Sequence, residues 1–199
     1  MLAGEVFLRP MQEKDTAKVA ELEKQVCSMP WSAQGFSDAL QQDVIFSVAE
    51  IEGRAEGQIE GRTEGQIDGR IEGQIDGRIE GQIEGRTEGR IEGQIDGRIE
   101  GQIEGYCGMY CSLEEGEITN VAVNPMMQRQ GIGRKVVEDV LQQASKRGIT
   151  QVVLEVRVSN HPAITLYEKL GFQEIGIRKG FYEKPKEDAA IMSLELSSI

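Results

Sequence analysis

Hydrophobic positions between residues 118 and 171 repeat with two different periods, which predicts alternating strands and helices. Residues 118–123 form a short apolar strand that runs into a turn containing Gly131 and Gly133. The next apolar residues recur three or four positions apart, as on one face of a helix: Ile132, Val136, Val137, Val140, Leu141 and Ala144. Gly148 follows, where a helix end favours a left-handed residue. A buried strand at 150–158 and a helix at 160–170 complete the segment.

The same periods predict elements on both sides of this segment. Asp15 and Thr16 lead into an amphipathic helix, and Ser32 is a suitable N-cap for a second helix at 33–41. Strand signals are found at 5–9, 44–51, 105–112, 117–123, 172–179 and 189–196. The predicted order is β-α-α-β-β-β-α-β-α-β-β.

Residues 51–106 interrupt this pattern with fourteen tetrapeptide units, which with few exceptions are Ile-Glu-Gly-Arg, Ile-Glu-Gly-Gln or Ile-Asp-Gly-Arg. Three interpretations remain open: a disordered low-complexity spacer, because frequent glycine raises the entropy cost of order, an extended β-hairpin, or a β-solenoid. Either way, we expect residues 1–50 and 107–199 to form a single domain and residues 51–106 to be an insertion without chemistry of its own.

Charge and cysteine content narrow the class of protein. The net charge is −12, of which the tract contributes −7, and an acidic surface argues against nucleic acid or membrane as partner. The sequence has neither a signal pattern nor a long apolar run. Three cysteines and one histidine predict free thiols in a cytoplasmic protein and no metal site. A monomer is favoured.

The turn at 128–133 is the first candidate binding site. Two glycines at a helix start let the backbone approach a ligand, and the free N–H groups there attract phosphate oxygens. Arg129 and Arg134 add positive charge. The turn lacks the motifs of a dinucleotide fold or a P-loop, and glycines also serve tight turns that bind nothing. The pattern alone therefore leaves both interpretations open.

A wider pattern resembles the GNAT family of N-acetyltransferases. Its acetyl-CoA pyrophosphate loop has the form Q/R-x-x-G-x-G/A, as in Gln128–Gly133. The RimI-type branch, which acetylates the N-terminal alanine of a small-subunit ribosomal protein, is resembled by 154–160, Ala163 and 166–172. Further matching residues are Pro30, Trp31, Ser32, Tyr182, Glu187, Asp188 and Ala189. The resemblance covers nearly the whole chain outside the tract.

This resemblance implies an α/β (α+β) fold with a mixed, mostly antiparallel sheet flanked by helices, and the tract inserted between the second and third strands. It also implies acetyl-CoA as cosubstrate, without a metal. The residues expected to hold acetyl-CoA are Val121, Ala122 and Val123 through their backbone, Arg129, Gln130, Gly131, Ile132, Gly133 and Arg134 in the loop, and Asn160.

Two residues are candidates for catalysis. Glu155 stands among apolar strand residues, where a carboxylate is costly to bury. It is either the partner of a cation such as Arg157 or, by resemblance, the general base. Tyr167 is either a core tyrosine or, by resemblance, the acid that protonates the coenzyme thiolate. Asn160 is suited to cap the following helix as well as to bind the coenzyme.

The acceptor is less well defined by the sequence. Trp31 and Tyr182 match residues of the peptide groove, although aromatic core packing explains them nearly as well. Phe181 replaces the first tyrosine of a usual pair. We expect the acceptor to be a protein N-terminus, that of a basic ribosomal protein, because about a tenth of α-amines but only about one lysine in 2,500 is neutral at pH 7. An acetyltransferase for lysine or a small amine, and a repeat-dependent scaffold, are the alternatives.

Overall fold

The computed structural model describes residues 6–61, 74–75, 77–78 and 91–196. The chain forms two compact units. One comprises Met1–Phe7 and Ile51–Gln102, and the other comprises Leu8–Glu50 and Ile103–Ile199. The second unit, hereafter the main domain, contains the described helices and the residues that the sequence marks as functional.

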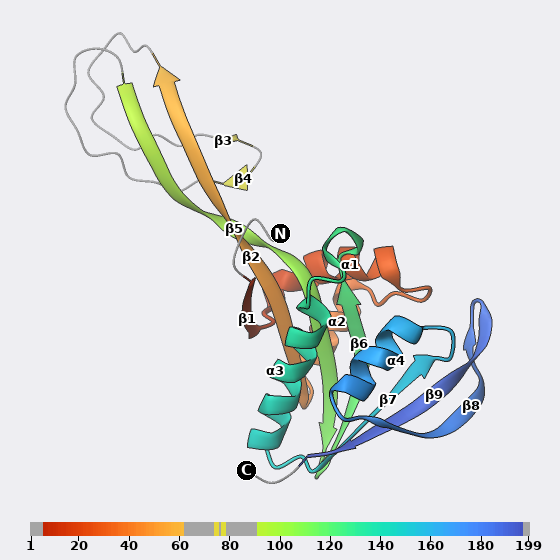
Figure 1. Ribbon diagram of the computed structural model, residues 1–199. Helices are drawn as coiled ribbons and strands as arrows, with labels where there is room; N and C mark the ends of the chain where they lie inside the picture. The colour runs from red at the N-terminus through yellow and green to blue at the C-terminus, as the bar shows by residue number, and fades with distance from the viewer. Residues whose placement is uncertain (1–5, 62–73, 76, 79–90, 197–199) are drawn as a thin grey trace. The chain divides into compact units, whose positions relative to one another are not determined.

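A mixed sheet runs through the main domain in the strand order β1-β2-β5-β6-β7-β9-β8 (Figure 1). Strands β6 and β7 pair in parallel, whereas β5 with β6, β7 with β9 and β8 with β9 pair antiparallel. The strands are β1 (Val6–Pro10), β2 (Val44–Gly61), β5 (Ile91–Ser112), β6 (Glu115–Val123), β7 (Gln151–Arg157), β8 (Gln173–Glu183) and β9 (Lys186–Glu195).

Helices cover both faces of this sheet (Figure 1). One face carries α1 (Thr16–Val26) and α2 (Ala33–Leu40), and the other carries α3 (Ile132–Lys146) and α4 (His161–Lys169). Two short 3-10 helices, η1 (Glu13–Asp15) and η2 (Pro125–Met127), precede α1 and the loop before α3. The predicted class, a mixed and mostly antiparallel sheet flanked by helices, is confirmed.

The core beneath α1 and α2 is aromatic. Phe36 and Tyr106 are fully buried, with ring centroids 5.5 Å apart at 88°, and Phe46 lies 5.9 Å from Phe36. Val19 and Leu22 of α1 close the cluster. Tyr106 stands in the last tetrapeptide unit, so this unit supplies the core with a large side chain.

The core beneath α3 follows the predicted helical stripe. Ile132, Val136, Val137, Val140, Leu141 and Ala144 are all buried. Gly105 on β5 faces this helix, because a Cβ there would lie 2.8 Å from Cγ2 of Ile132. Since neighbouring residues of a strand point to opposite faces, Gly105 and Tyr106 contact the two different helical layers.

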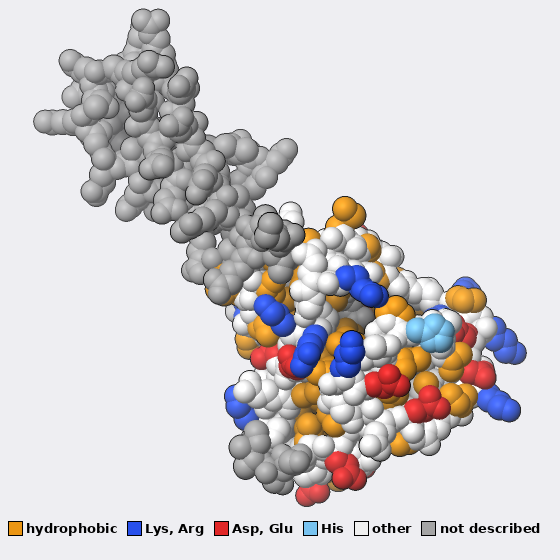
Figure 2. Space-filling view, in the orientation of Figure 1, with side chains coloured by type: hydrophobic (Ala, Val, Ile, Leu, Met, Phe, Trp, Pro, Cys, Tyr) orange, Lys and Arg blue, Asp and Glu red, His pale blue; other side chains and the backbone are white. Residues whose placement is uncertain are grey.

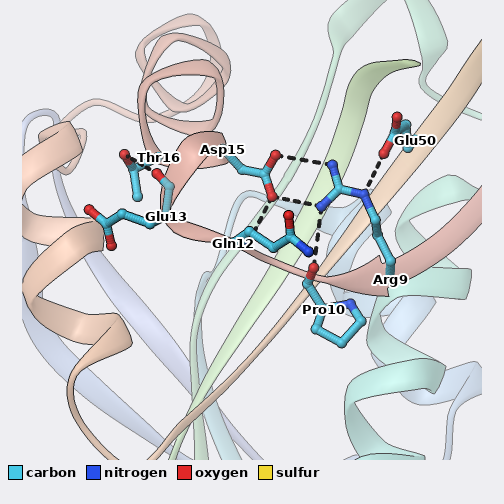
Figure 3. Close-up of polar contacts among 7 residues, drawn as sticks. All are labelled: Arg9, Pro10, Gln12, Glu13, Asp15, Thr16 and Glu50. Carbon is cyan, nitrogen blue, oxygen red and sulfur yellow. Dashed lines mark hydrogen bonds and ion pairs between the residues drawn. The ribbon is translucent and has the colours of Figure 1, made fainter. Parts of the chain in front are cut away.

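An ion cluster holds the start of the main domain together (Figure 3). The guanidinium of Arg9 donates to both carboxylate oxygens of Asp15, at 2.6 and 3.0 Å, and its Nε also donates to Glu50. Asp15 further accepts the Gln12 amide at 2.8 Å. Burial pushes the pKa of Asp15 upward, but the bonds from Arg9 and Gln12 outweigh it and the pKa falls below its ordinary value. The cluster joins β1, η1 and β2.

Within the other unit, the described parts of the repeat tract are extended. Strand β2 continues to Gly61 and β5 begins at Ile91, and a short pair, β3 (Gln74–Ile75) and β4 (Gly77–Arg78), is antiparallel. Extended ends suit the hairpin interpretation, but residues 62–73, 76 and 79–90 lie outside the described part. The division of the chain into domain and insertion therefore stays a prediction.

Most predicted elements have the expected type and position. The strands predicted at 44–51 and 105–112 extend farther into the repeat tract, as β2 and β5, and those predicted at 172–179 and 189–196 are Gln173–Glu183 and Lys186–Glu195. The predicted caps are also present. Ser32 Oγ accepts the Gly35 amide at 3.0 Å, and Gly148 has φ +84°.

Candidate functional site

Strands β6 and β7 are parallel neighbours that separate halfway along their length. Their pairing extends only from Glu115 opposite Gln151 to Ile118 opposite Leu154. Farther on, β6 pairs with β5 and β7 pairs with β9, and Figure 1 shows the two strands diverging. The facing edges of β6 and β7 are therefore not paired with each other at residues 120–123 and 155–157.

A β-bulge marks the place where β6 turns away. Gly108 lies opposite Asn120 and Met109 opposite Ile118, so Thr119 is the extra residue on β6. Bulges increase local twist and are common beside active sites, where they redirect a strand.

The backbone of β6 beyond the bulge faces the free edge at alternate residues. The amide of Asn124 donates to the Glu104 carbonyl on β5 at 2.8 Å. Since successive backbone groups point to opposite edges of a strand, the amides of Val121 and Val123 point away from β5. An extended ligand placed along this edge would meet backbone donors, while the Ala122 side chain belongs to the core.

The loop that follows is shaped by two left-handed residues. Arg129 has φ +63° and Gly131 has φ +85°, and Gly131 is the N-cap of α3. The first helical bond runs from the Lys135 amide to the Gly131 carbonyl at 3.1 Å. The amides of the first turn, at Ile132, Gly133 and Arg134, have no partner within the helix, so they are available to an anion.

Positive charge accumulates around this helix start. Arg129, Arg134 and Lys135 are exposed, and Figure 2 shows basic side chains gathered on the face formed by α3 and α4. Gln130 is also exposed and donates to the Met127 sulfur at 3.8 Å. Arg134 pairs with Glu138 at 2.7 Å, an exposed pair of little strength, which leaves the guanidinium free to exchange partners.

Glu155 lies on β7 just past the point of divergence. Its side chain is 18% exposed and accepts from Arg178 of β8 at 3.0 Å. The cation that the sequence suggested as its partner, Arg157, instead pairs with Glu187 at 3.0 Å. Glu155 is thus held by a single, mostly exposed arginine and stays accessible to solvent.

Arg157 connects the segments on both sides of Glu155. Its guanidinium lies 4.0 Å over the ring of Tyr182 and donates to Ser28 Oγ at 3.0 Å. Tyr182 in turn donates to the Glu155 carbonyl at 3.3 Å. Burial raises the pKa of Tyr182, while the charge of Arg157 opposes the rise. The connection after α1 and the β8–β9 hairpin are therefore fixed to the same point of β7.

Tyr167 lies on α4, on the other face of the sheet. It is buried, and its ring centroid lies 5.7 Å from that of Phe172. Burial, with smaller effects of Cys107 and Tyr182, raises the pKa of Tyr167 above its ordinary value. The hydroxyl thus keeps its proton at neutral pH and is a possible proton donor.

Two further candidates have clear structural roles. The Asn160 side chain accepts the Ala163 amide at 3.3 Å and caps α4. The ring of Trp31 packs 5.4 Å from Phe36 and 6.3 Å from Tyr110. Asn160 is exposed at the start of α4, whereas the contacts of Trp31 favour core packing.

A buried carboxylate escaped the sequence reasoning. Glu23 of α1 is 1% exposed and accepts from Asn120 Nδ2 at 2.6 Å and from the Trp31 amide at 2.7 Å. Burial and the nearby Glu23 charge raise the pKa of Cys27 to about 12. Glu23 lies four positions after Val19 and three before Val26, so the helical spacing places it on the apolar stripe of α1, and this spacing is the signal that could have found it.

The arrangement combines three features of an acyl-transfer site: an open strand edge, an anion-binding helix start, and a carboxylate and a tyrosine on opposite faces of the sheet. Within the part of the chain that the structure describes, no group of His, Cys, Asp or Glu side chains is arranged to hold a metal ion. None of the described helices is long and apolar enough to span a membrane.

Comparison with known proteins agrees with this geometry. A model of the acetyltransferase (GNAT) family matches residues 17–172. The ribosomal protein bS18-alanine N-acetyltransferase of Escherichia coli strain K12 is 47% identical over 87 residues, which are 43% of this chain and 59% of that enzyme. The chain therefore spans less than two thirds of this relative.

Solved structures extend the similarity of the fold to nearly the whole chain. The ribosomal-protein-S18-alanine N-acetyltransferase from Escherichia coli has a TM-score of 0.67 at 24% identity, covering 98% of this chain and 96% of that one. A NatC complex bound to Gag peptide and CoA has a TM-score of 0.64 at 19% identity, covering 97% and 99%.

Proposed function

Because the chain belongs to the GNAT family of acetyltransferases, we propose that it transfers acetyl from acetyl-CoA to the N-terminal α-amine of a protein. The observation that carries the proposal is the divergence of β6 and β7, with a glycine-capped helix start at the end of β6 and Glu155 on β7. The proposed acceptor is the N-terminal alanine of a small-subunit ribosomal protein, as named for the relative from Escherichia coli.

The chemistry of the residues present fits acetyl-CoA. The amides of Ile132, Gly133 and Arg134 at the start of α3 would receive the pyrophosphate, with Arg129 and Gln130 beside it. A Cβ on Gly133 would lie 3.5 Å from Val123 and 3.6 Å from Leu166, so the glycine leaves the first turn open. The backbone amides of Val121 and Val123 would bind the extended arm, and Asn160 stands at the start of α4. When bound, the coenzyme supplies an activated acetyl thioester.

Glu155 would act as the general base. It accepts a proton from the amine, directly or through water, while the amine nitrogen attacks the thioester carbonyl. A backbone amide of the free β6 edge would stabilise the oxyanion. The carbon–sulfur bond then breaks, and the thiolate leaves with the electron pair.

Tyr167 would protonate that thiolate. Its buried hydroxyl keeps the proton, and it lies on the face opposite Glu155, so acid and base would act from the two sides of the divergent strands. Tyr182 and Trp31 would contact the acceptor. In the complete reaction, the acetyl group moves from sulfur to nitrogen, the amine gives one proton to Glu155, and the thiolate takes one proton from Tyr167.

The test is acetyl transfer to a peptide that begins with the ribosomal alanine sequence, compared with an otherwise identical peptide whose N-terminus is blocked and which retains its lysines. We expect transfer to the α-amine only. Glu155→Gln should lower kcat by about 10²- to 10⁴-fold, and the exposed Glu195→Gln serves as the matched control.

Three outcomes would contradict the proposal or a part of it. Transfer to the blocked peptide would identify a lysine acetyltransferase, and transfer to free amines alone would identify a small-molecule enzyme. An unchanged kcat in Glu155→Gln would remove Glu155 as the base.

A further inference from the structure

The last tetrapeptide unit, Ile103 to Tyr106, is part of the main domain. Ile103 packs against the core and Tyr106 is fully buried within it. Glu104 is 6% exposed, an unusual burial for a carboxylate. The unit begins Ile-Glu-Gly like most of the other repeats but ends in Tyr where they have Arg or Gln, and its residues make contacts that an inert spacer does not require.

Glu104 holds Asn124 by two bonds. The Glu104 carboxylate accepts from Asn124 Nδ2 at 2.6 Å, and the Glu104 carbonyl accepts from the Asn124 amide at 2.8 Å. A buried carboxylate forms strong hydrogen bonds when paired and is costly when left alone. The two residues are 20 positions apart in sequence, so this contact fixes the end of β6 to β5.

Asn124 passes this restraint to the loop. Its Oδ1 accepts the Met126 amide at 3.0 Å and its carbonyl accepts the Met127 amide at 2.8 Å, so it caps η2. Directly after η2 comes the loop with Arg129 and Gly131. The position of the α3 start therefore depends on Asn124, and Asn124 depends on Glu104.

Gly105, the residue after Glu104, packs closely against the first residue of α3. A Cβ there would lie 2.8 Å from Ile132 Cγ2 and 3.1 Å from the Ala122 carbonyl, closer than side-chain atoms approach. Ile132 is the first residue of α3. Gly105 thus permits the close packing of α3 on β5. Glu104, the residue before it, fixes the position from which the chain enters the phosphate-binding loop.

We propose that Glu104 is a positioning residue for the phosphate-binding loop, so that the last repeat unit tunes the affinity for acetyl-CoA; this rests on the proposed function. Glu104 acts through Asn124 and η2 and does not touch the coenzyme. Its loss should weaken coenzyme binding without changing the chemical step.

The test measures coenzyme A binding by calorimetry and acetyl-CoA kinetics for Glu104→Ala, Glu104→Gln and Glu100→Ala. Glu100 has the same place in the preceding unit and is the matched control. Glu104→Ala should raise Kd and KM roughly tenfold, the effect of one strong hydrogen bond, with kcat unchanged. Glu104→Gln, whose amide oxygen still accepts from Asn124, should restore most of the affinity.

A reversed pair tests the contact itself. Asn124→Asp keeps the cap of η2 but places two carboxylates together, and it should weaken coenzyme A binding by at least as much. In the double variant Glu104→Gln/Asn124→Asp, the glutamine amide donates to the aspartate carboxylate, so the hydrogen bond is restored with donor and acceptor exchanged. The double variant should recover the affinity for coenzyme A. This pair also decides the question if Glu104→Ala does not fold.

The outcomes separate this proposal from the proposed function. Equal coenzyme A affinity in Glu104→Ala and the unaltered protein, or no recovery in the reversed pair, would overturn the role of Glu104. Binding of coenzyme A without acetylation of any peptide would overturn only the proposed function. A protein that binds no coenzyme A would overturn both.

Discussion

At the scale of single residues, the site depends on how Glu155 and Tyr167 are held. Glu155 stays partly exposed beside Arg178, whereas Tyr167 is buried next to Phe172. These environments differ in the way that acid and base roles require, since a base needs access to a proton and an acid needs to retain one.

Replacing Tyr167 by Phe should remove the proton donor while keeping the ring contact with Phe172, so the fold should persist. We expect kcat to fall by about 10²-fold and KM for acetyl-CoA to change little. Because burial raises the pKa of Tyr167, the protonated form persists to higher pH. The alkaline side of the pH–kcat profile should therefore show no loss from this group below about pH 10, the ordinary value for tyrosine.

Tyr110→Phe is the control, because Tyr110 packs near Trp31 in the other core layer. An alkaline loss of activity below pH 9 that is present in the natural protein and absent in Tyr167→Phe would contradict the buried-acid interpretation.

The same residues show the limit of sequence reasoning at this scale. Glu155 was identified because a carboxylate in an apolar strand is unusual, but its cation was not. Arg157 was the nearest choice in sequence, yet Glu187 holds it from 30 residues away, while Arg178 reaches Glu155 from 23 residues away. Ion pairs between residues this far apart in sequence depend on how the β8–β9 hairpin folds, and a local sequence pattern does not predict that geometry.

At the scale of elements, the helix ends were predictable because capping is local. Asn160 bonds a residue three positions on, and Gly148 adopts the left-handed conformation that ends α3. Strand β8 was predicted too short because none of its residues is buried, so no alternation reveals it, and β9 was predicted to begin at residue 189 because its first buried residue is Ala189. A bond from the Gly180 amide to Asp188 at 2.7 Å helps to extend the hairpin.

The glycines at the two ends of α3 allow the loss of a ligand contact to be distinguished from the effect of backbone strain. Gly131 and Gly148 have φ of +85° and +84°, and a Cβ would meet nothing within 4 Å at either one. Replacing either by Ala should therefore lower the free energy of unfolding by a similar amount, about 1 kcal/mol. Only Gly131→Ala should also raise Kd for coenzyme A, because it alone lies at the proposed phosphate site.

Thermal denaturation and calorimetry measure both quantities. Equal loss of coenzyme A affinity in the two variants would mean that strain, not position, controls binding. No loss in Gly131→Ala would place the phosphates elsewhere.

At the scale of the whole molecule, the main domain has a core of its own, to which the last repeat unit contributes Tyr106. The domain comprises Leu8–Glu50 and Ile103–Ile199, and the residues proposed for catalysis and coenzyme binding all lie within these two ranges. The sequence suggested this by the abrupt change of composition at residue 51, but it could not show that the last unit serves the domain.

Deleting residues 55–102 should therefore leave an active enzyme. The deletion removes twelve whole units and joins Arg54 to Ile103, so it keeps the Glu104 and Gly105 contacts. We expect kcat and KM for acetyl-CoA within about threefold of the full chain, which corresponds to less than 1 kcal/mol. Extending the deletion through residue 106, the boundary that composition alone indicates, removes Glu104 and Tyr106 as well and should weaken coenzyme binding and lower the melting temperature.

The comparison of these two deletions locates the edge of the domain. If both behave alike, Glu104 and Tyr106 contribute nothing that the remaining strands cannot replace. If the shorter deletion already abolishes transfer while coenzyme A still binds, the tract takes part in acceptor recognition and the protein acts as more than a single catalytic domain. Glu155→Gln in the shorter deletion provides the low-activity reference, because it should bind coenzyme A normally and show the same loss of kcat, about 10²- to 10⁴-fold, in either background.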